Sequence, residues 1–505
     1  MLRKWRKNQE EINMKENDKE YCRRYVARIV IETLSPLSVG TGESSMITEQ
    51  VVAKDVNGLP YIPGTAIAGI LRNTIGEHIA KSFFGFNLEN IDNSGEGSQV
   101  IFSSAFLMDA DKRIVEGILH KDKSDYLKQF NNLPIRQHVN ITDKGTGKKR
   151  GKFDEEIVFK GTRFCFEMEM VSEEDSNEMN FINLLNTLVK SDLHIGSGTR
   201  SGLGEFKVVS YKAIIFDFYS PDEKTTKLPN NSGIYFVEKG LEDYIRKTSS
   251  LNDTIWEDNA WADDCVSANN LSQTNNSDWT TYKLDLVPDD FFLFGSGFGD
   301  EDAEMTPVSE LYFDWNNDSP ELVEDTILIP ASSVKGAISH RIAFYYNKFC
   351  GIYADKIEKN CLDKYTGHNN EAIRKIFGYT VPKTKEAMRG NVIISDVIRE
   401  KKSEKGKILN HVAIDRFTGG AIDSALFSEK VTCGKDEKYT LILKVNKKDA
   451  FPEENENIEK AFSAALRDIS CGMLPLGGGV NRGHGCFSGN VYENDKIIID
   501  NGKII

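Results

Sequence analysis

The chain carries one series of sequence motifs twice, and this duplication constrains its fold more than any other feature. IGSGTRSGLGEF (Ile195–Phe206) and LGGGVNRGHGCF (Leu476–Phe487) share the glycine spacing G-x-G-x-x-x-G-x-G and end on a phenylalanine. Five further pairs recur in the same order: SVGTGE with LFGSGFGD, YIPGTAIAGILR with LIPASSVKGAIS, FFGF and VIFSSAF with IFGY and VIISDVI, RQHVNI with LNHVAI, and KFDEEIVFKGTRFCFEM with ALFSEKVTCGKDEKYTLIL. The series predicts two copies of one fold in tandem.

The motif positions divide the chain into four parts. We predict an N-terminal extension over residues 1–21, a first copy over 22–215, a second copy over 281–505, and between them an acidic linker or insertion over 216–280 that is rich in Asn, Ser and Asp. A length of 505 residues agrees with two domains, since one hydrophobic core seldom serves so long a chain.

Composition narrows the class of protein. Hydrophobic residues make up 39% of the chain, and no apolar run is long enough for a membrane span, so we expect no membrane partner and a cytoplasmic location. The basic N-terminus has no apolar stretch behind it and does not resemble a secretory signal. The eight cysteines are scattered without a CxxC pair, which argues against structural zinc and disulfides.

The net charge of −14 and the pI near 5.3 would ordinarily argue against a polyanionic partner. The charge is uneven, however, because residues 216–280 are acidic while DKGTGKKRGK (Asp143–Lys152) is strongly basic. A local basic path therefore remains compatible with this composition.

The first copy has the element order of a ferredoxin-like or RNA-recognition-type α+β sandwich. Alternating residues predict a strand in YVARIVIETL, and helical periodicity follows Pro63 in GTAIAGILRNTIGEHIAKSFFG. A strand (QVIFSSAFLM), a basic hairpin, a strand (GTRFCFEMEMV), a helix (MNFINLLNTLVKSD) and a final strand (GEFKVVSYKAI) come next. The fold class is thus α+β, with a βαββαβ order in each copy.

The glycine-rich segments admit two interpretations. They lie between a helix and a strand and carry no Gly-Lys-Ser/Thr, so they are neither Rossmann nor Walker loops. They are either tight turns packed on neighbouring backbone, or loops whose amides and arginine face phosphates or another subunit. The eight glycines concerned are Gly196, Gly198, Gly202, Gly204, Gly477, Gly479, Gly483 and Gly485.

Two other features suggest anion binding, each beside a plainer explanation. The predicted helix N-termini in IPGTAIAGILR and IPASSVKGAISHR lie near Arg72, Ser333 and Lys335 and could bind a phosphate, or could simply be capped core helices. RQHVNITDKGTGKKRG and LNHVAIDRFTGGA each predict a polar hairpin that projects toward a partner. A lone histidine in such a hairpin is more often structural than catalytic.

Acidic residues gather in the first loop of each copy. Carboxylates facing RNA could hold Mg²⁺ or Mn²⁺, although most acidic loops are merely solvated. The residues concerned are Glu43, Glu49 and Asp55 in copy one and Asp300, Glu301, Asp302 and Glu304 in copy two.

These motifs together resemble the RAMP superfamily of CRISPR-associated proteins, and in particular the backbone subunits of type III effector complexes, with a tandem fusion similar to subtype III-D-like complexes. The resemblance implies an RNA-recognition-type palm, a thumb hairpin in each copy, guide RNA (crRNA) and single-stranded target RNA as ligands, other effector subunits as partners, and a role in antiviral defence. It implies RNA contacts by Arg72, Arg136, His138, Lys148, Lys149, Arg150, Arg200, Ser333, Lys335, His411, Arg416, Arg482 and His484.

The resemblance also implies an acidic loop residue that supports divalent-metal-dependent cleavage of target RNA. Counting back from Lys54 and Asp55 places it at Glu49 in copy one, where a glutamate replaces the family's aspartate. In copy two the loop is expected to be about a dozen residues longer, and Asp302 and Glu304, with Asp300, are the expected catalytic and metal-binding residues, so copy two is expected to be the active one.

Two alternatives stay open. The protein could be a structural crRNA-binding subunit with inert acidic loops, or a stand-alone ribonuclease that processes precursor crRNA with a histidine as general base. The histidines available for the latter are His78, His138, His194, His340, His411 and His484.

Overall fold

The computed structural model describes residues 23–42, 44, 48–87, 95–118, 124–142, 144–172, 178–189, 193–217, 279–315, 319–381, 386–401, 405–434 and 437–505. The predicted N-terminal extension, Glu43, Asp143 and nearly all of the predicted linker lie outside these residues. None of the helices described is long and apolar enough to cross a bilayer.

Copy one is an antiparallel sheet with helices on one face, which the predicted element order anticipated. Strand order β4-β8-β1-β9 places the first strand between the third and the fourth, as in a ferredoxin-like sandwich. The sheet elements are β1 (Arg23–Thr33), β4 (Val100–Phe102), β5 (Phe106–Leu107), β8 (Arg163–Ser172) and β9 (Phe206–Asp217), and the helices are α2 (Gly64–Thr74), α3 (Glu77–Phe84), α4 (Asp125–Lys128) and α5 (Glu178–Val189).

Two expected elements of copy one are interrupted. The single helix expected after Pro63 is two helices, because Ile75 is extended (φ −80°, ψ 145°) and Gly76 begins a new helix at Glu77. The strand expected in QVIFSSAFLM is divided into β4 and β5. Both breaks leave the predicted βαββαβ order intact.

Copy two repeats the arrangement with the order β17-β21-β10-β22, extended by β23 and β24. Its elements are β10 (Trp279–Pro288), β11 (Phe291–Phe292), β12 (Tyr312–Asp314), β13 (Glu321–Val323), β14 (Thr326–Ile329), α9 (Ala331–Phe349), α10 (Glu371–Phe377), β15 (Gly378–Val381), β16 (Glu386–Arg389), β17 (Val392–Ile394), β18 (Val397–Glu400), β21 (Tyr439–Asn446), α11 (Lys447–Ala450), α12 (Asn457–Ser470), β22 (Phe487–Glu493), β23 (Lys496–Asp500) and β24 (Lys503–Ile504). Copy one has a small hairpin, β2 (Phe86–Asn87) with β3 (Gly95–Glu96), at the place of β15 and β16.

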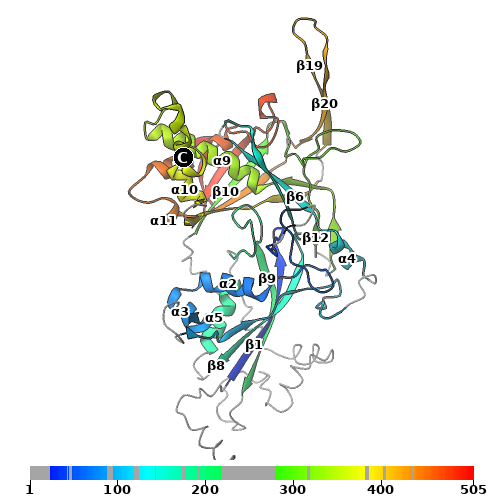
Figure 1. Ribbon diagram of the computed structural model, residues 1–505, viewed down its shortest axis with the longest axis vertical. Coiled ribbons are helices and arrows are strands. Elements are labelled where there is room, and N and C mark those ends of the chain that lie inside the picture. The colour runs from blue at the N-terminus through cyan, green and yellow to red at the C-terminus, as the bar shows by residue number, and fades with distance from the viewer. Residues whose placement is uncertain are drawn as a thin grey trace, which may run out of the picture.

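Each copy carries the predicted long hairpin. Hairpin one is β6 (Ile135–Ile141) with β7 (Gly147–Glu156), and hairpin two is β19 (Lys405–Ile414) with β20 (Ala421–Cys433). Hairpin one runs from copy one toward copy two, whereas hairpin two extends freely from the end of the molecule that copy two forms (Figure 1).

The two copies have separate cores that are tied together by a hairpin of copy two. Phe313 on β12 is buried in the core of copy one, in contact with Tyr126, Phe130 and Phe159. Trp315 joins them and donates its indole N–H to the carbonyl of Gly161 at 2.7 Å. The additional residues of copy two that form β12 and β13 therefore pack onto copy one. We call this hairpin the clamp.

Candidate functional site

The junction between the copies holds three cationic side chains that we call the junction cluster: Arg200, Lys335 and Arg389. Arg200 lies in glycine loop one (Ile195–Phe206) and donates from Nε to the carbonyl of Gly390 at 2.9 Å, with its guanidinium 4.9 Å from the ring centre of Trp279. Lys335, in the second turn of α9, donates to the hydroxyl of Ser201 at 3.3 Å. Residues from both copies are thus needed to build it.

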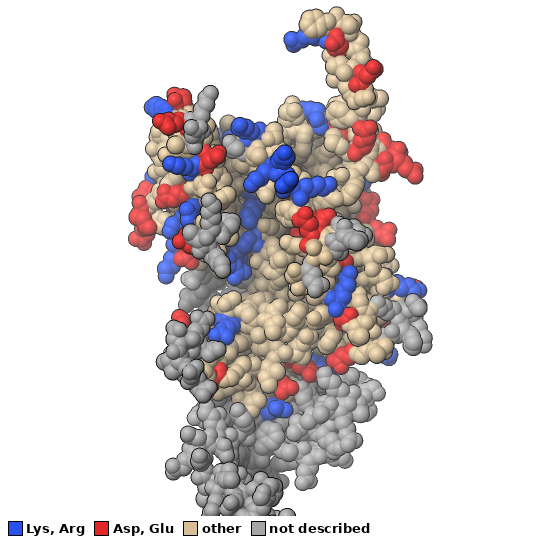
Figure 2. Space-filling view, in the orientation of Figure 1, with Lys and Arg blue, Asp and Glu red and all other residues tan. Residues whose placement is uncertain are grey.

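The junction cluster carries positive charge without a matching negative one. None of its three members forms an ion pair with a carboxylate in the described part of the chain. Burial lowers the pKa of Arg200 to about 10, with a further contribution from Arg389, and burial and then Arg200 lower the pKa of Lys335. Arg200 and Lys335 are half-buried and Arg389 is exposed, and cations that repel one another favour an anion between them. Lys and Arg side chains follow one another down the middle of this face, between α9 and β6 (Figure 2).

The glycine-rich loops are tight turns, as the plainer interpretation predicted. All eight glycines have positive φ. A Cβ on Gly204 would lie 2.0 Å from the carbonyl of Ile195, and one on Gly485 would lie 2.0 Å from that of Leu476. In glycine loop one, Gly202 also abuts Ala331 and Asp396 of copy two, so the loop doubles as a contact between the copies.

Beside glycine loop two (Leu476–Phe487), the base of hairpin two holds a buried carboxylate, Glu429. It accepts hydrogen bonds from Arg482 at 2.5 Å, and its other oxygen lies 2.8 Å from His411 Nε2 and 3.0 Å from His484 Nε2. Phe427 stacks on His411 with ring centres 4.8 Å apart. Arg482 and His411 keep part of their surface exposed beside this anchor.

Hairpin one repeats the core of this arrangement. His138 Nε2 lies 2.8 Å from Glu155, and Phe153 stacks on the imidazole with ring centres 4.8 Å apart. Glycine loop one has Ser201 and Leu203 at the places of Arg482 and His484, so Glu155 lacks those two partners. The duplication therefore extends from the fold to a His–Glu–Phe unit in each hairpin.

Two of the predicted RNA contacts are wrong, since the side chains are buried in the protein. The Arg136 guanidinium is enclosed by Glu310 and by Asp396, the latter at 2.7 Å, and both carboxylates belong to copy two. The His484 ring is buried against Glu429. Arg136 links the two copies, and His484 positions Glu429.

The other predicted RNA contacts lie on the surface or partly on it. Lys148, Lys149 and Arg150 are exposed on β7, Arg416 is exposed at the end of hairpin two, Arg72 is exposed in the last turn of α2, and Ser333 is exposed at the start of α9. On the face drawn in Figure 2, acidic side chains lie among the basic ones.

The acidic loops of the two copies correspond residue by residue. Bridges pair Gly40 with Val52 and Gly295 with Pro307, and further bridges pair Gln50 with Glu155 and Met305 with Glu429. The loops are therefore equally long up to this point, and Glu49 corresponds to Glu304. The loop of copy two is about a dozen residues longer overall, as expected, and the extra residues follow Pro307 and form β12 and β13.

Both glutamates are exposed at a hairpin base. The Glu49 amide donates to Asp154 at 2.8 Å, and the Glu304 amide donates to the hydroxyl of Ser428 at 3.2 Å. Because β7 and β20 hold them in the same way, the structure gives no reason to prefer copy two over copy one.

Asp300 and Asp302 have a different environment from Glu304. Asp300 Oδ1 accepts the amides of Asp302 and Ala303, and its Oδ2 lies 2.8 Å from Lys430 Nζ. The hydrogen bond from Lys430, with those from the two amides, lowers the pKa of Asp300. Asp300 therefore shapes the loop, and its catalytic role stays a prediction. Asp302 shares Lys430 at 3.3 Å but stays exposed.

The acidic loops offer few donor groups for a divalent metal. No set of three or more His, Cys, Asp or Glu side chains that could hold a metal occurs among the described residues. Mg²⁺, however, is commonly bound by one or two carboxylates together with water and substrate phosphates. Glu304 and Asp302, or Glu49 in copy one, would therefore fit a metal only if a phosphate-bearing ligand supplied further oxygens.

Five residues of the site were not predicted from the sequence: Glu155, Glu310, Arg389, Asp396 and Glu429. Glu155 and Glu429 fall in the matched segments KFDEE and ALFSEK, so the repeat alone could have drawn attention to them. Arg389 and Glu310 fall outside the matched segments, and Asp396 lies within VIISDVI but stands opposite Ser104, so the repeat does not mark them. Their significance arises from contacts with residues far away in the chain.

The duplicated chain matches one known protein family twice. A family model described as the RAMP superfamily matches residues 30–207 and again 291–488. The chain belongs to the RAMP superfamily and contains two of its domains, each with the ferredoxin-like α+β fold. None of the curated proteins matches. A solved structure titled "Type III-B Cmr-beta Cryo-EM structure of the Apo state" is similar with 14% identity and a TM-score of 0.28, covering 36% of this chain and 97% of the other.

Proposed function

We propose that this protein is a backbone subunit of a type III CRISPR-Cas effector complex that binds crRNA and cleaves the complementary target RNA with Mg²⁺ or Mn²⁺. The observation that carries the RNA-binding part is the junction cluster. Its three cations, which have no carboxylate partner among the described residues, converge beside a glycine loop and the start of α9. A phosphodiester backbone supplies the negative charge that this place lacks. Antiviral defence in the cytoplasm, with other effector subunits as partners, belongs to this proposal.

Target cleavage is assigned to Glu49 and Glu304. A divalent metal bound with the RNA would supply charge neutralisation at the scissile phosphate. The exposed carboxylates, held at the hairpin bases through their own backbone amides, would orient that metal. Because Glu49 and Glu304 occupy corresponding positions, one in each copy, we expect two cleavage positions and not one. The inert structural subunit remains the second candidate, because carboxylates on solvated loops are common.

Guide binding is tested with Arg200→Ala and Lys335→Ala. Each substitution is expected to weaken crRNA binding similarly for different guide sequences and to reduce the slope of log affinity against log salt by about 0.7. Lys496→Ala, an exposed lysine on β23, serves as the control and should change neither quantity. Unchanged affinity and slope for both junction variants would remove the support for an RNA site at the junction.

Cleavage is tested in the assembled complex with labelled target RNA. Glu49→Gln and Glu304→Gln should each remove a different product, the double variant should remove both, and chelation of divalent metal should have the same effect as the double variant. Asp300→Asn should retain the products. A product ladder that none of these changes alters would favour the inert subunit, whereas metal-independent cleavage of precursor crRNA by the isolated chain would favour the processing ribonuclease.

A further inference from the structure

Lys430 places a positive charge on the acidic loop of copy two. Its Nζ lies 2.8 Å from Asp300 Oδ2 and 3.3 Å from Asp302 Oδ2. Its backbone amide donates to the carbonyl of Met305 at 2.8 Å, so β20 holds the lysine beside the residue that follows Glu304. Two of the three carboxylates predicted for cleavage by copy two are therefore in contact with an ammonium group of the chain itself.

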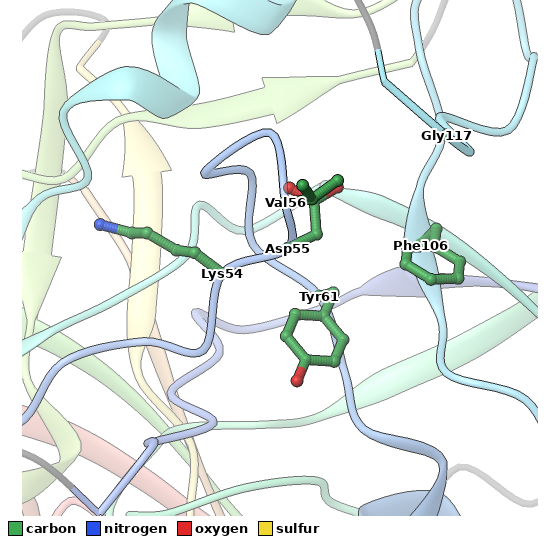
Figure 3. A pocket seen from close by; sticks show the side chains of 6 residues that line it. All are labelled: Lys54, Asp55, Val56, Tyr61, Phe106 and Gly117. Carbon is green, nitrogen blue, oxygen red and sulfur yellow. The ribbon is translucent and has the colours of Figure 1, made fainter.

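Copy one has an acidic residue at the place of Lys430. The correspondence of the two acidic loops puts Glu156 at this place. Glu156 accepts hydrogen bonds from Lys54 Nζ at 2.7 Å and from the amide of Val52 at 3.0 Å. Lys54 and Tyr61 both line a pocket of about 410 Å³, and the lysine side chain extends away from the ring (Figure 3). The ammonium group of Lys54 is thus held by a carboxylate of β7.

The carboxylates of the two loops are also placed differently. Copy one lacks the two aspartates that Lys430 contacts, since Ser45 and Ile47 stand in their places in the sequence. Asp154, which accepts the amide of Glu49 at 2.8 Å, instead provides a second carboxylate beside that glutamate. Copy one therefore offers a metal two neighbouring carboxylates, whereas copy two offers carboxylates that a lysine contacts.

An ammonium group and a divalent metal compete for the same carboxylate oxygens. The side chains of Lys430, Asp300 and Asp302 are 31%, 42% and 63% exposed, so water screens this ion pair and a metal can displace the lysine. After displacement the ammonium group remains close to the metal, and the like charges repel each other. Lys430 therefore weakens the binding of a metal by Asp302 and Glu304, whereas copy one has a glutamate in the same position.

We propose that Lys430 competes with the divalent metal for Asp302, so that cleavage by copy two requires a higher metal concentration than cleavage by copy one. This competition, which rests on the proposed function of the two acidic loops, makes the copies differ in their metal requirement. Target RNA is cut first at the position assigned to Glu49 and, as the metal concentration rises, also at the position assigned to Glu304.

The first measurement is a manganese titration of target cleavage by the assembled complex. In the wild type, the product that depends on Glu304 is expected to reach half of its maximal rate at a higher Mn²⁺ concentration than the product that depends on Glu49. Lys430→Gln should lower the concentration needed for the Glu304 product about three- to tenfold and leave the Glu49 product unchanged. Lys430→Arg keeps the positive charge and should behave like the wild type.

The second measurement is Mn²⁺ binding, followed by the electron paramagnetic resonance signal of the free ion. The complex carries a target whose nucleotides at the cleavage positions are 2′-deoxy, which keeps the target intact, and Glu49→Gln removes the copy-one site. In this background Lys430→Gln should tighten Mn²⁺ binding by the same factor as in the cleavage assay. Lys407→Gln is the matched control and should change neither quantity, since this lysine lies on the same hairpin but contacts the ring of Phe291.

The possible outcomes separate this competition from the function on which it rests. Equal Mn²⁺ requirements of the two products in the wild type, an unchanged requirement in Lys430→Gln, or unchanged Mn²⁺ binding in that variant would each show that the lysine does not compete with the metal. A wild-type complex that binds target RNA but cuts it at neither position would instead contradict the proposed cleavage.

Discussion

At the level of single residues, buried carboxylates are matched by cations drawn from distant parts of the chain. Glu429 on β20 is held by Arg482 and two histidines, and Glu310 by Arg136. Removing one partner of a buried ion pair lowers the free energy of unfolding far more than removing one partner of an exposed pair. These residues therefore carry both stability and the orientation of the surfaces around them.

Glu429 makes the stability of copy two depend on pH. Burial alone would raise its pKa, but hydrogen bonds from His484, Arg482 and His411 lower it below the ordinary value of 4.5. Because the folded pKa is the lower one, this contribution is complete above about pH 4.5 and is lost as the pH falls through the folded pKa. Glu429→Gln should cost about 1–3 kcal/mol at pH 6 and less at pH 3.5.

Urea unfolding at the two pH values measures this difference. Glu453→Gln, an exposed glutamate, serves as the control and should show little change at either pH. If Glu429→Gln lowers the free energy of unfolding by the same amount at pH 6 and pH 3.5, the hydrogen bonds of His484, Arg482 and His411 do not make the stability of copy two depend on pH.

At the level of elements, the β12–β13 hairpin is the one that departs most from the repeat. It belongs to copy two in sequence but buries Phe313 in copy one. Phe313→Ala should destabilise the protein by about 3–5 kcal/mol, since it removes a buried ring from a cluster of aromatic residues. The loss should appear in copy one, detected by protease cleavage within its strands.

Phe417→Ala provides the comparison for that prediction. The ring at the tip of hairpin two is almost fully exposed, so its removal should change stability by less than about 0.5 kcal/mol. Equal effects of the two substitutions on unfolding would show that Phe313 does not act through the core of copy one.

At the level of the whole molecule, the two copies should unfold as one unit. Arg136 joins Glu310 and Asp396 across the junction, and Asp396 also accepts the first amide of α9 at 2.6 Å. Arg136→Ala should cost about 3–5 kcal/mol because it leaves two carboxylates buried without a cation. Arg136→Leu combined with Glu310→Leu should lose less than the sum of the two single changes.

Differential scanning calorimetry measures this coupling. Wild-type protein should show a single transition, and Arg136→Ala should shift it to a lower temperature or divide it in two. Two well-separated transitions in the wild type would show instead that the junction contributes little to the stability of either copy.

The repeated motifs predicted much of the fold, because periodicity and turn residues act locally. The βαββαβ order, the two hairpins and the tight turns at the glycine loops all follow from segments of a few residues whose patterns the chain repeats. The site was less predictable. Arg136, Arg200 and Lys335 were all candidates from the sequence and have the same charge, but Arg136 is buried in an ion pair.

The sequence alone determines that the chain is duplicated, which class of fold each copy has, and which residues recur in both copies. Only the tertiary structure decided which cations meet carboxylates and which are left to face an anion, that Glu49 and Glu304 correspond, and that the extra hairpin of copy two clamps copy one. The physical reason is the range of the interactions. Hydrophobic periodicity depends on residues that are close in sequence. Ion pairing and burial depend on groups that the fold brings together across more than a hundred residues of chain.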